Sequence, residues 1–254
     1  NDKQIDVVSR CRKDSPDSPS PSQPSGSLPR LGLCCAFVQE PIHFRRTTAR
    51  YITTLKPGKR HEFLWQIAAD NVRALALAIN WCAAHRIGAF RLNSEILPLA
   101  THPQVGYQLD ELDQTGELRT AFVDAGIQAS QRQVRLSFHP DQFVVPGSLR
   151  EDVVQSSLAE LEHQALVAEL IGAEQLTLHG GGAQGGKSAA LDRLRRNLAK
   201  LSSRAHERIA LENDDRLYTV MDLLPLCRKE GFPLVYDVHH HRCNTDGMSV
   251  EEAT

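Results

Sequence analysis

The sequence lacks the features that mark several common protein classes. None of its six cysteines stands in a C-x-x-C spacing, which argues against a zinc ribbon or a thioredoxin-like site. The cysteines also lie in mixed surroundings, so we expect no disulfide framework and favour a reducing compartment, the bacterial cytoplasm or a eukaryotic nucleus. No apolar run approaches the roughly 18 residues of a membrane span. We therefore expect no segment that crosses a membrane and no membrane partner.

The sequence also lacks a strong charge of either sign. Its formal net charge is −2, which gives no overall attraction to nucleic acid, so any such binding must depend on a local basic patch. With 254 residues, 41% hydrophobic and 24% charged, the chain is long enough for one large α/β domain. Residues 1–29 are rich in Ser and Pro and poor in apolar residues, which predicts a disordered tail before a domain over 30–254.

Six apolar segments predict strands, and each is followed by a longer segment. They are LGLCCAF, GAFRLN, VRLSFHP, QLTLHGGG, RIALEND and PLVYD. Apolar periodicity predicts helices over His61–Ala84, Leu109–Ala125, Arg150–Ile171, Lys187–Arg204 and Leu217–Glu230. Connections of this length favour parallel strands with right-handed crossovers, as in a (β/α)8 TIM barrel. Because eight units make such a barrel, we expect one that is truncated after its sixth unit, at Thr254.

Histidines and carboxylates recur where these strands end. The residues at the exits of strands two to six are His102, His139, His179, Glu212, Asp237 and His240. A single histidine of this kind is more often structural, but a barrel directs successive exits to one mouth. Imidazole mixed with carboxylate suits Zn²⁺, Mn²⁺ or Fe²⁺. Glu212 lies between the histidine exits and the last exit, so we expect it to bridge two metals.

Such a metal cluster fits more than one reaction. Two metals about 4 Å apart commonly hydrolyse phosphodiesters. A metal-dependent sugar isomerase or epimerase on the same barrel uses similar ligands, so the ligands alone leave the substrate open.

A competing motif runs from Gly181 to Ser188. It satisfies G-x-x-x-x-G-K-S between a strand and a helix, and PLVYD could serve as a Walker B strand. A P-loop nucleotide-binding module is therefore a further alternative, although it leaves the histidines without a role. The same glycines could form a simple turn, or a backbone contact for a nucleic-acid phosphate that Lys187 assists.

A basic segment, His43 to Arg60, follows the first predicted strand and contains no acidic residue. In isolation such a run is more often a solvated loop. Its place at the mouth end of a barrel favours phosphate contacts, and Arg45 and Arg46 are the candidates.

Five motifs together resemble the UV damage endonuclease family. The resemblance extends from about Leu31 to Asn244, and the motifs are, in order, RLNSEILPLATHP, RLSFHPDQFVVPGS, LHGGGAQGGKSAALDRLRRNL, LENDD and DVHHHRCN. The resemblance implies a metal-dependent (β/α)8 enzyme that nicks double-stranded DNA immediately 5′ to UV photoproducts. Apurinic nucleases of the endonuclease IV type and xylose isomerase-like enzymes also bind metals through histidines and carboxylates on a barrel, but they do not share these motifs.

The resemblance also implies roles for single residues. The metal ligands would be His139, His179, Glu212, Asp237 and His240, holding two or three ions, with Mn²⁺ expected and Zn²⁺ or Mg²⁺ as alternatives. His102, Glu212 and Lys187 would act in catalysis. Gln142 and Phe143 match a pair that pushes into the duplex at the lesion. Apart from the resemblance, we expect DNA contacts from Arg45, Arg46 and Asn93, and DNA or loop contacts from Arg242 and Asn244. We expect His239 and His241 either to support the ligands from behind or to be structural.

The sequence departs from the family in two places. Leu33 stands where some members carry an aromatic residue at the first strand. The family places further ligands on strands that would follow Thr254, so we expect this chain to bind metal incompletely and to nick poorly. We expect a monomer without an obligate protein partner.

Overall fold

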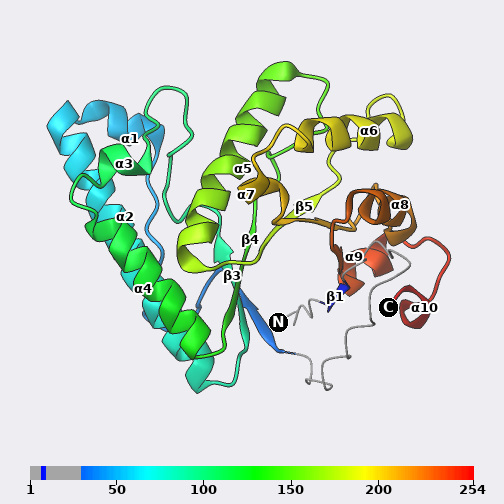
Figure 1. The fold of residues 1–254 in the computed structure, drawn as a ribbon, viewed down its shortest axis with the longest axis horizontal. Helices are drawn as coiled ribbons and strands as arrows, with labels where there is room; N and C mark the ends of the chain where they lie inside the picture. Colours follow the sequence, from blue (N-terminus) through cyan, green and yellow to red (C-terminus); the bar gives the residue numbers. More distant parts are fainter. Residues whose placement is uncertain (1–6, 10–29) are drawn as a thin grey trace, which may run out of the picture.

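The computed structural model of the chain describes residues 7–9 and 30–254. In that part, one seven-stranded sheet is flanked by helices (Figure 1). The strands are β1 (Val7–Ser9), β2 (Gly32–Cys34), β3 (Ala89–Asn93), β4 (Arg135–His139), β5 (Gln175–His179), β6 (Ile209–Glu212) and β7 (Leu234–Tyr236). Their order is β1-β7-β6-β5-β4-β3-β2. Strands β2 to β7 are parallel neighbours in chain order, so the six predicted strands and their parallel arrangement are confirmed.

The six parallel strands form a curled half-barrel, which confirms the predicted α/β class and barrel architecture. Of the predicted tail, only Val7–Ser9 is described, and this strand pairs antiparallel with β7 through Val8 and Val235. The rest of that prediction lies outside the described residues.

The helices lie between the strands as predicted, but their bounds differ. They are α1 (Ala49–Thr54), α2 (Pro57–Ala84), α3 (Leu109–Leu112), α4 (Glu117–Gln131), α5 (Glu151–Ile171), α6 (Lys187–Leu198), α7 (Ser203–His206), α8 (Val220–Glu230), α9 (Val238–Cys243) and α10 (Val250–Ala253). The prediction of a basic loop over 43–60 was partly wrong. Thr48 caps α1 by accepting from the amide of Tyr51, and Pro57 starts α2, because a proline fits the first turn of a helix.

Two predicted helices are each divided in two. The prediction over Leu109–Ala125 was wrong in its middle, because Asp113 accepts hydrogen bonds from the amides of Leu118 and Arg119 and so starts α4 afresh. The prediction over Lys187–Arg204 was wrong for a similar reason: Ser202 caps α7 by accepting from the amide of Ala205.

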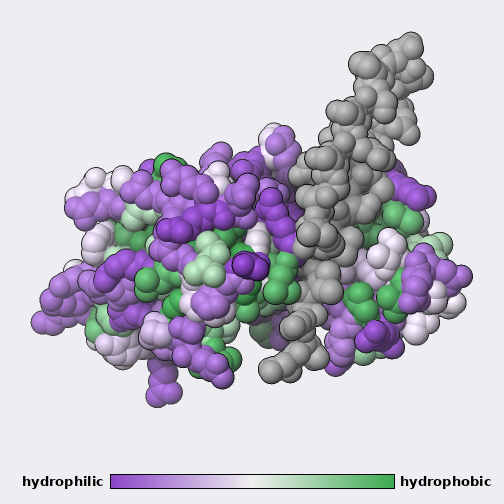
Figure 2. All heavy atoms as spheres, turned by 90° about the horizontal axis from the view of Figure 1, so that it is seen from below, coloured by the Kyte–Doolittle hydropathy of each residue, from purple (hydrophilic) through white to green (hydrophobic). Residues whose placement is uncertain are grey.

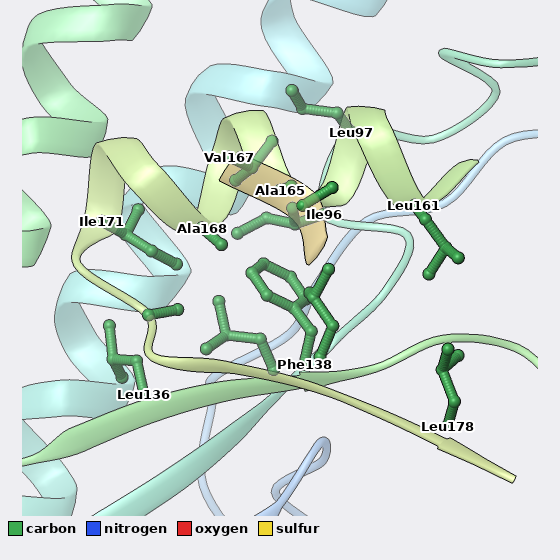
Figure 3. Close-up of a cluster of buried hydrophobic side chains, with 14 of the residues drawn as sticks. Ile96, Leu97, Leu136, Phe138, Leu161, Ala165, Val167, Ala168, Ile171 and Leu178 are labelled. Carbon is green, nitrogen blue, oxygen red and sulfur yellow. The ribbon is translucent and has the colours of Figure 1, made fainter. Parts of the chain in front are cut away.

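The hydrophobic core lies between the sheet and the helices that cover one of its faces. Figure 3 shows Leu136 and Phe138 of β4 pointing towards Ala165 and Ala168 of α5. Phe138 is fully buried there. Side chains alternate along β4, so Arg135, Ser137 and His139 face the other side of the sheet and are only partly buried. The strand therefore carries a polar face that ends in His139.

No helix in the described ranges is long and apolar enough to span a bilayer. Figure 2 shows a face on which hydrophilic residues predominate and hydrophobic ones lie among them.

Candidate metal centre

The register of the sheet places the predicted ligands at one edge. His179 of β5 is paired with Glu212 of β6, so both side chains lie at the carboxyl ends of neighbouring strands. Glu212 is in turn paired with Val235 of β7, and Asp237 follows two residues later on the same face. The curl of the sheet then brings the end of β4, with His139, towards this group. The carboxyl edge of a parallel sheet is where α/β enzymes carry their sites.

The structure brings all five predicted ligands into two groups of three. The groups are His139, His179 and Glu212, and Glu212, Asp237 and His240. In each group the candidate ligand atoms lie within 4.8 Å of one another. Glu212 belongs to both groups, which is the arrangement expected of a bridging carboxylate.

His139 contacts Glu212 directly. Its Nε2 lies 2.9 Å from Oε2 of Glu212, and its Nδ1 lies 3.0 Å from the carbonyl oxygen of Pro140. A carbonyl oxygen only accepts, so Nδ1 carries the hydrogen and, in the neutral ring, Nε2 carries the lone pair. Two lone pairs at 2.9 Å need a proton or a cation between them. The pair is therefore suited to share a metal ion.

His179 is poised to stay neutral. Burial lowers the pKa of its ring, the charge of Glu212 opposes that effect, and the rings of His139 and His240 lower the pKa again. The centroid of the His179 ring lies 4.9 Å from the ring centroid of His139 and 5.3 Å from that of His240. A lowered pKa favours the neutral imidazole, which is the form that binds metals.

Asp237 and His240 lie at the start of α9 rather than on a strand. Asp237 is the N-cap: its Oδ1 accepts from the amide of His240 at 2.9 Å. The helix separates the three consecutive histidines. His239 is exposed, whereas His241 is buried and its Nε2 lies 3.0 Å from the carbonyl oxygen of Met248. These positions agree with the distinction drawn between His240 and its two neighbours.

The donor set fits a divalent cation. Glu212 is 1% exposed, and its Oε1 has no hydrogen-bond partner among the described residues. Nδ1 of His179 is likewise buried without such a partner. A buried carboxylate with an unsatisfied oxygen is costly, and a cation bound by imidazole and carboxylate would compensate that cost.

The other two predicted catalytic residues lie outside both groups. His102 follows β3, and its Nδ1 accepts from the amide of Gln104 at 3.2 Å. Lys187 begins α6, and its Nζ donates to Oδ2 of Asp222 at 2.6 Å. Their catalytic roles stay predictions.

Two glycines before α6 are closely packed. A Cβ on Gly180 would lie 2.5 Å from Cδ2 of Tyr218, and a Cβ on Gly181 would lie 2.8 Å from Cγ1 of Val145. Both distances are too short for any residue with a side chain. Packing thus explains Gly181 of the P-loop-like pattern, whereas its second glycine, Gly186, has nothing within 4 Å of an added Cβ and instead adopts a φ of +96°, which favours glycine.

The predicted lesion-contacting pair lies on an exposed turn after β4. Phe143 is 77% exposed, and Gln142 beside it is exposed as well. Oδ1 of Asp141 accepts from the amide of Phe143 at 2.9 Å, and the carbonyl oxygen of Asp141 accepts from the amide of Val144 at 2.9 Å. An ordered turn thus presents an aromatic ring to solvent.

The predicted arginines at the mouth are ion-paired. Arg45 contacts Asp70 of α2, and its guanidinium lies 5.7 Å from the ring centroid of Phe63. Nε of Arg46 lies 2.9 Å from Oε2 of Glu95, and both side chains are largely exposed. An exposed ion pair of this kind contributes little to stability.

The last candidate DNA contacts lie at the end of β3 and at the end of α9. Asn93 ends β3, and its Oδ1 accepts from the amide of Glu95 at 2.9 Å. Arg242 is exposed on α9, and Nδ2 of Asn244 donates to the carbonyl oxygen of Asp214 at 3.1 Å. Their DNA contacts stay predictions.

Asn213 is the residue of this centre to which the sequence assigned no role. It follows Glu212, is 1% exposed and hydrogen-bonds the backbone of Asp237. Its position directly after a predicted ligand is the one signal in the sequence that points to it.

A half-barrel whose carboxyl edge gathers histidines and carboxylates defines a barrel-type α/β protein with a candidate metal centre. The chain belongs to the family described as UV-endonuclease UvdE, whose model matches residues 29–254. This confirms the family resemblance drawn from the motifs.

Named relatives extend this result. The chain is 37% identical to the UV DNA damage endonuclease of Deinococcus radiodurans, over 85% of this chain and 70% of that protein. It is 35% identical to the UV-damage endonuclease of Neurospora crassa, over 86% of this chain and 34% of that protein. It is 31% identical to the UV DNA damage endonuclease of Bacillus cereus strain G9842, over 78% of this chain and 62% of that protein. The chain therefore spans about a third of the Neurospora relative and 62% of the Bacillus one.

Solved structures share the fold. The crystal structure of SacUVDE matches with a TM-score of 0.79 and 29% identity, over 88% of this chain and 74% of that one. A D-psicose 3-epimerase from Clostridium cellulolyticum H10 matches with a TM-score of 0.50 and 9% identity, over 68% of this chain and 61% of that one. The second likeness concerns the fold alone.

Proposed function

We propose that the chain carries the catalytic centre of a metal-dependent endonuclease that nicks double-stranded DNA 5′ to UV photoproducts. The observation that supports this most is the pair of three-residue groups that share the buried Glu212. Membership of the UV-endonuclease family and the names of the relatives support the substrate.

The five grouped residues would hold the cations, two or three of them, with Mn²⁺ as the proposed metal and Zn²⁺ or Mg²⁺ as alternatives. Divalent cations held there supply Lewis acidity to a phosphodiester and its leaving oxygen. The protein's own part is to orient the ligand atoms. The carbonyl oxygens of Pro140 and Asn213 fix the rings of His139 and His240 with Nε2 free of hydrogen.

The turn that carries Gln142 and Phe143 would contact the lesion. A planar aromatic ring can enter a gap in the base stack, and an amide can hydrogen-bond bases that have lost their partners. A photoproduct weakens stacking and pairing locally, so insertion costs less there than in intact duplex. Exposure of Phe143 on an ordered turn supports this role, because an aromatic side chain that only stabilised the fold would be buried.

The test is a nicking assay of a full-length version of the protein with a duplex that carries one photoproduct. With Mn²⁺, the expected product is a nick on the 5′ side of the lesion that leaves a 3′-hydroxyl. An undamaged duplex of the same sequence and an EDTA arm serve as controls, and the Glu212→Gln variant is expected to lose nicking with its fold retained. Equal cutting of undamaged DNA, or nicking that persists in EDTA, would contradict the proposal.

The two alternative functions can be tested with the same protein preparations. A metal-dependent sugar isomerase or epimerase would convert free ketoses and ignore DNA. A P-loop module would bind ATP, and that affinity would survive the loss of His139 and His179. We expect neither activity.

A further inference from the structure

We propose that Asn213 is a positioning residue of the metal centre, acting through two of its ligands, Asp237 and His240. This inference rests on the proposed metal-dependent function. It concerns how the ligands are held, a role that the sequence motifs assign to no residue.

The side-chain amide of Asn213 pairs with the backbone of Asp237 in both directions. Nδ2 donates to the carbonyl oxygen of Asp237 at 2.9 Å, and Oδ1 accepts from its amide at 2.8 Å. The orientation of the amide follows from chemistry, since a backbone N–H only donates and a carbonyl oxygen only accepts. The residue is 1% exposed, so water does not compete for these bonds.

These two hydrogen bonds between Asn213 and Asp237 lie just beyond the last residue pair of β6 and β7. The last pair between β6 and β7 is Glu212 with Val235, after which the chain turns into α9. At this point the side-chain amide of Asn213 bonds the N–H and C=O of Asp237, as a neighbouring strand would do. It thereby fixes Asp237 as the first residue after β7 and as the N-cap of α9.

The same residue orients His240. Nδ1 of His240 lies 2.9 Å from the backbone carbonyl oxygen of Asn213, so Nδ1 must carry the hydrogen and leaves a lone pair on Nε2. Oδ1 of Asp237 accepts from the amide of His240. The side chain of Asn213 thus holds one ligand, and its backbone sets the tautomer of another. Glu212, the shared ligand, is its neighbour along the chain.

A matched control exists elsewhere in the fold. Asn71 is also fully buried and clamps one residue in both directions: Oδ1 accepts from the amide of Arg45 at 2.6 Å, and Nδ2 donates to its carbonyl oxygen at 3.0 Å. Nδ2 also donates to the carbonyl oxygen of Ile96 at 2.8 Å. Asn71 belongs to α2, away from the grouped ligands. Loss of its amide should weaken the fold in a similar way without disturbing those ligands.

The experiment measures Mn²⁺ affinity by electron paramagnetic resonance, with the metal alone as ligand. Asn213→Ala is expected to weaken binding by about 10- to 100-fold, the usual effect of losing a residue that orients metal ligands. Asn71→Ala is expected to retain the wild-type affinity. Thermal unfolding of both metal-free variants shows whether their losses of stability are comparable. If Asn213→Ala does not fold, Asn213→Ser takes its place, with weakened binding again expected.

A spectroscopic readout separates positioning from general destabilisation. In the metal-free chain at alkaline pH, ¹⁵N resonances of His240 are expected to report the tautomer with hydrogen on Nδ1. In the Asn213 variant they are expected to shift towards a mixture, whereas Asn71→Ala leaves them unchanged.

The outcomes distinguish this inference from the proposed function. Unchanged Mn²⁺ affinity in the Asn213 variants, with affinity lost in Glu212→Gln, would overturn the positioning role alone. Unchanged affinity in Glu212→Gln as well would overturn the metal centre itself. Equal losses of affinity in Asn213→Ala and Asn71→Ala would also overturn the positioning role, because the effect would then follow stability.

Discussion

Nε2 of His139 lies 2.9 Å from Oε2 of Glu212, although β5 separates their strands in the sheet. In a flat sheet, two strands with one between them stand about 9–10 Å apart. Side chains that share one face of the curled sheet span that gap at its carboxyl edge, so residues of β4 and β6 come into contact. The fold thus acts directly on the candidate site, because it gathers the ends of separate strands.

Replacing Phe143 with alanine should remove lesion selectivity while the stability stays the same. The side chain is 77% exposed, so the free energy of unfolding is expected to change by less than about 0.5 kcal/mol. The expected result is a smaller ratio of nicking on damaged over undamaged duplex at unchanged Mn²⁺ affinity. Leu149→Ala is the matched control, since Leu149 is 66% exposed in the same connection. Equal effects of the two changes would remove the proposed role of Phe143.

Replacing Gly180 with alanine should destabilise the fold. Its Cβ would lie 2.5 Å from Cδ2 of Tyr218, a buried ring that cannot move aside without repacking. We expect a loss of about 1–3 kcal/mol, the usual cost of overpacking. The comparison is Gly58→Ala in the first turn of α2, where nothing lies within 4 Å of the new Cβ. That change should stabilise by about 0.4–1 kcal/mol. Urea unfolding measures both, and a Gly180 variant as stable as the wild type would contradict the packing account.

Replacing Asp222 with asparagine should lower stability in a pH-dependent manner. Burial alone raises the pKa of Asp222, but hydrogen bonds from Lys187 and Thr219 outweigh it and bring the pKa below 3.8. A depressed carboxyl pKa stabilises the fold above the unfolded value and loses that contribution as pH falls through the folded value. We expect a difference of about 1 kcal/mol at pH 7, because a helix cap and an ion pair are both weakened.

The pH series supplies the check. In urea unfolding, the gap between wild type and Asp222→Asn is expected to narrow steadily below pH 4. Lys187→Met removes the ion pair and leaves the cap from Thr219 in place, so its effect at pH 7 should be smaller. A gap that is the same at pH 7 and pH 3 would show that the charge of Asp222 contributes nothing.

The strands and most members of the two candidate ligand groups could be predicted because their signals are local. Each strand is a short apolar run, and His139, His179 and Glu212 are the last residues of theirs. Parallel strands present their carboxyl ends on one side, so the gathering of these residues follows from topology. The family motifs added the proposed roles of Gln142 and Phe143, which periodicity alone does not reveal.

What the sequence left out depends on specific side-chain contacts. The break between α3 and α4 requires Asp113 to bond two amides of the next helix, and the start of α9 requires Asp237 as its cap. Asp is common at such positions, but it is also common in loops, so the residue type alone does not decide. Asn213 was missed because its partner, Asp237, is 24 residues away. Such pairings appear only once the strands are aligned.

The measurement that tests the central claim most directly is the thermal unfolding of wild type and Glu212→Gln with and without Mn²⁺. A ligand at a hundredfold excess over its Kd stabilises the native state by about 2.7 kcal/mol, which corresponds to a rise in Tm of roughly 5–10 °C for a domain of this size. We predict that rise for the wild type and for Glu62→Gln, a change in an exposed ion pair with Lys59. We predict no rise for Glu212→Gln. An equal rise in Glu212→Gln would contradict a metal centre built on Glu212.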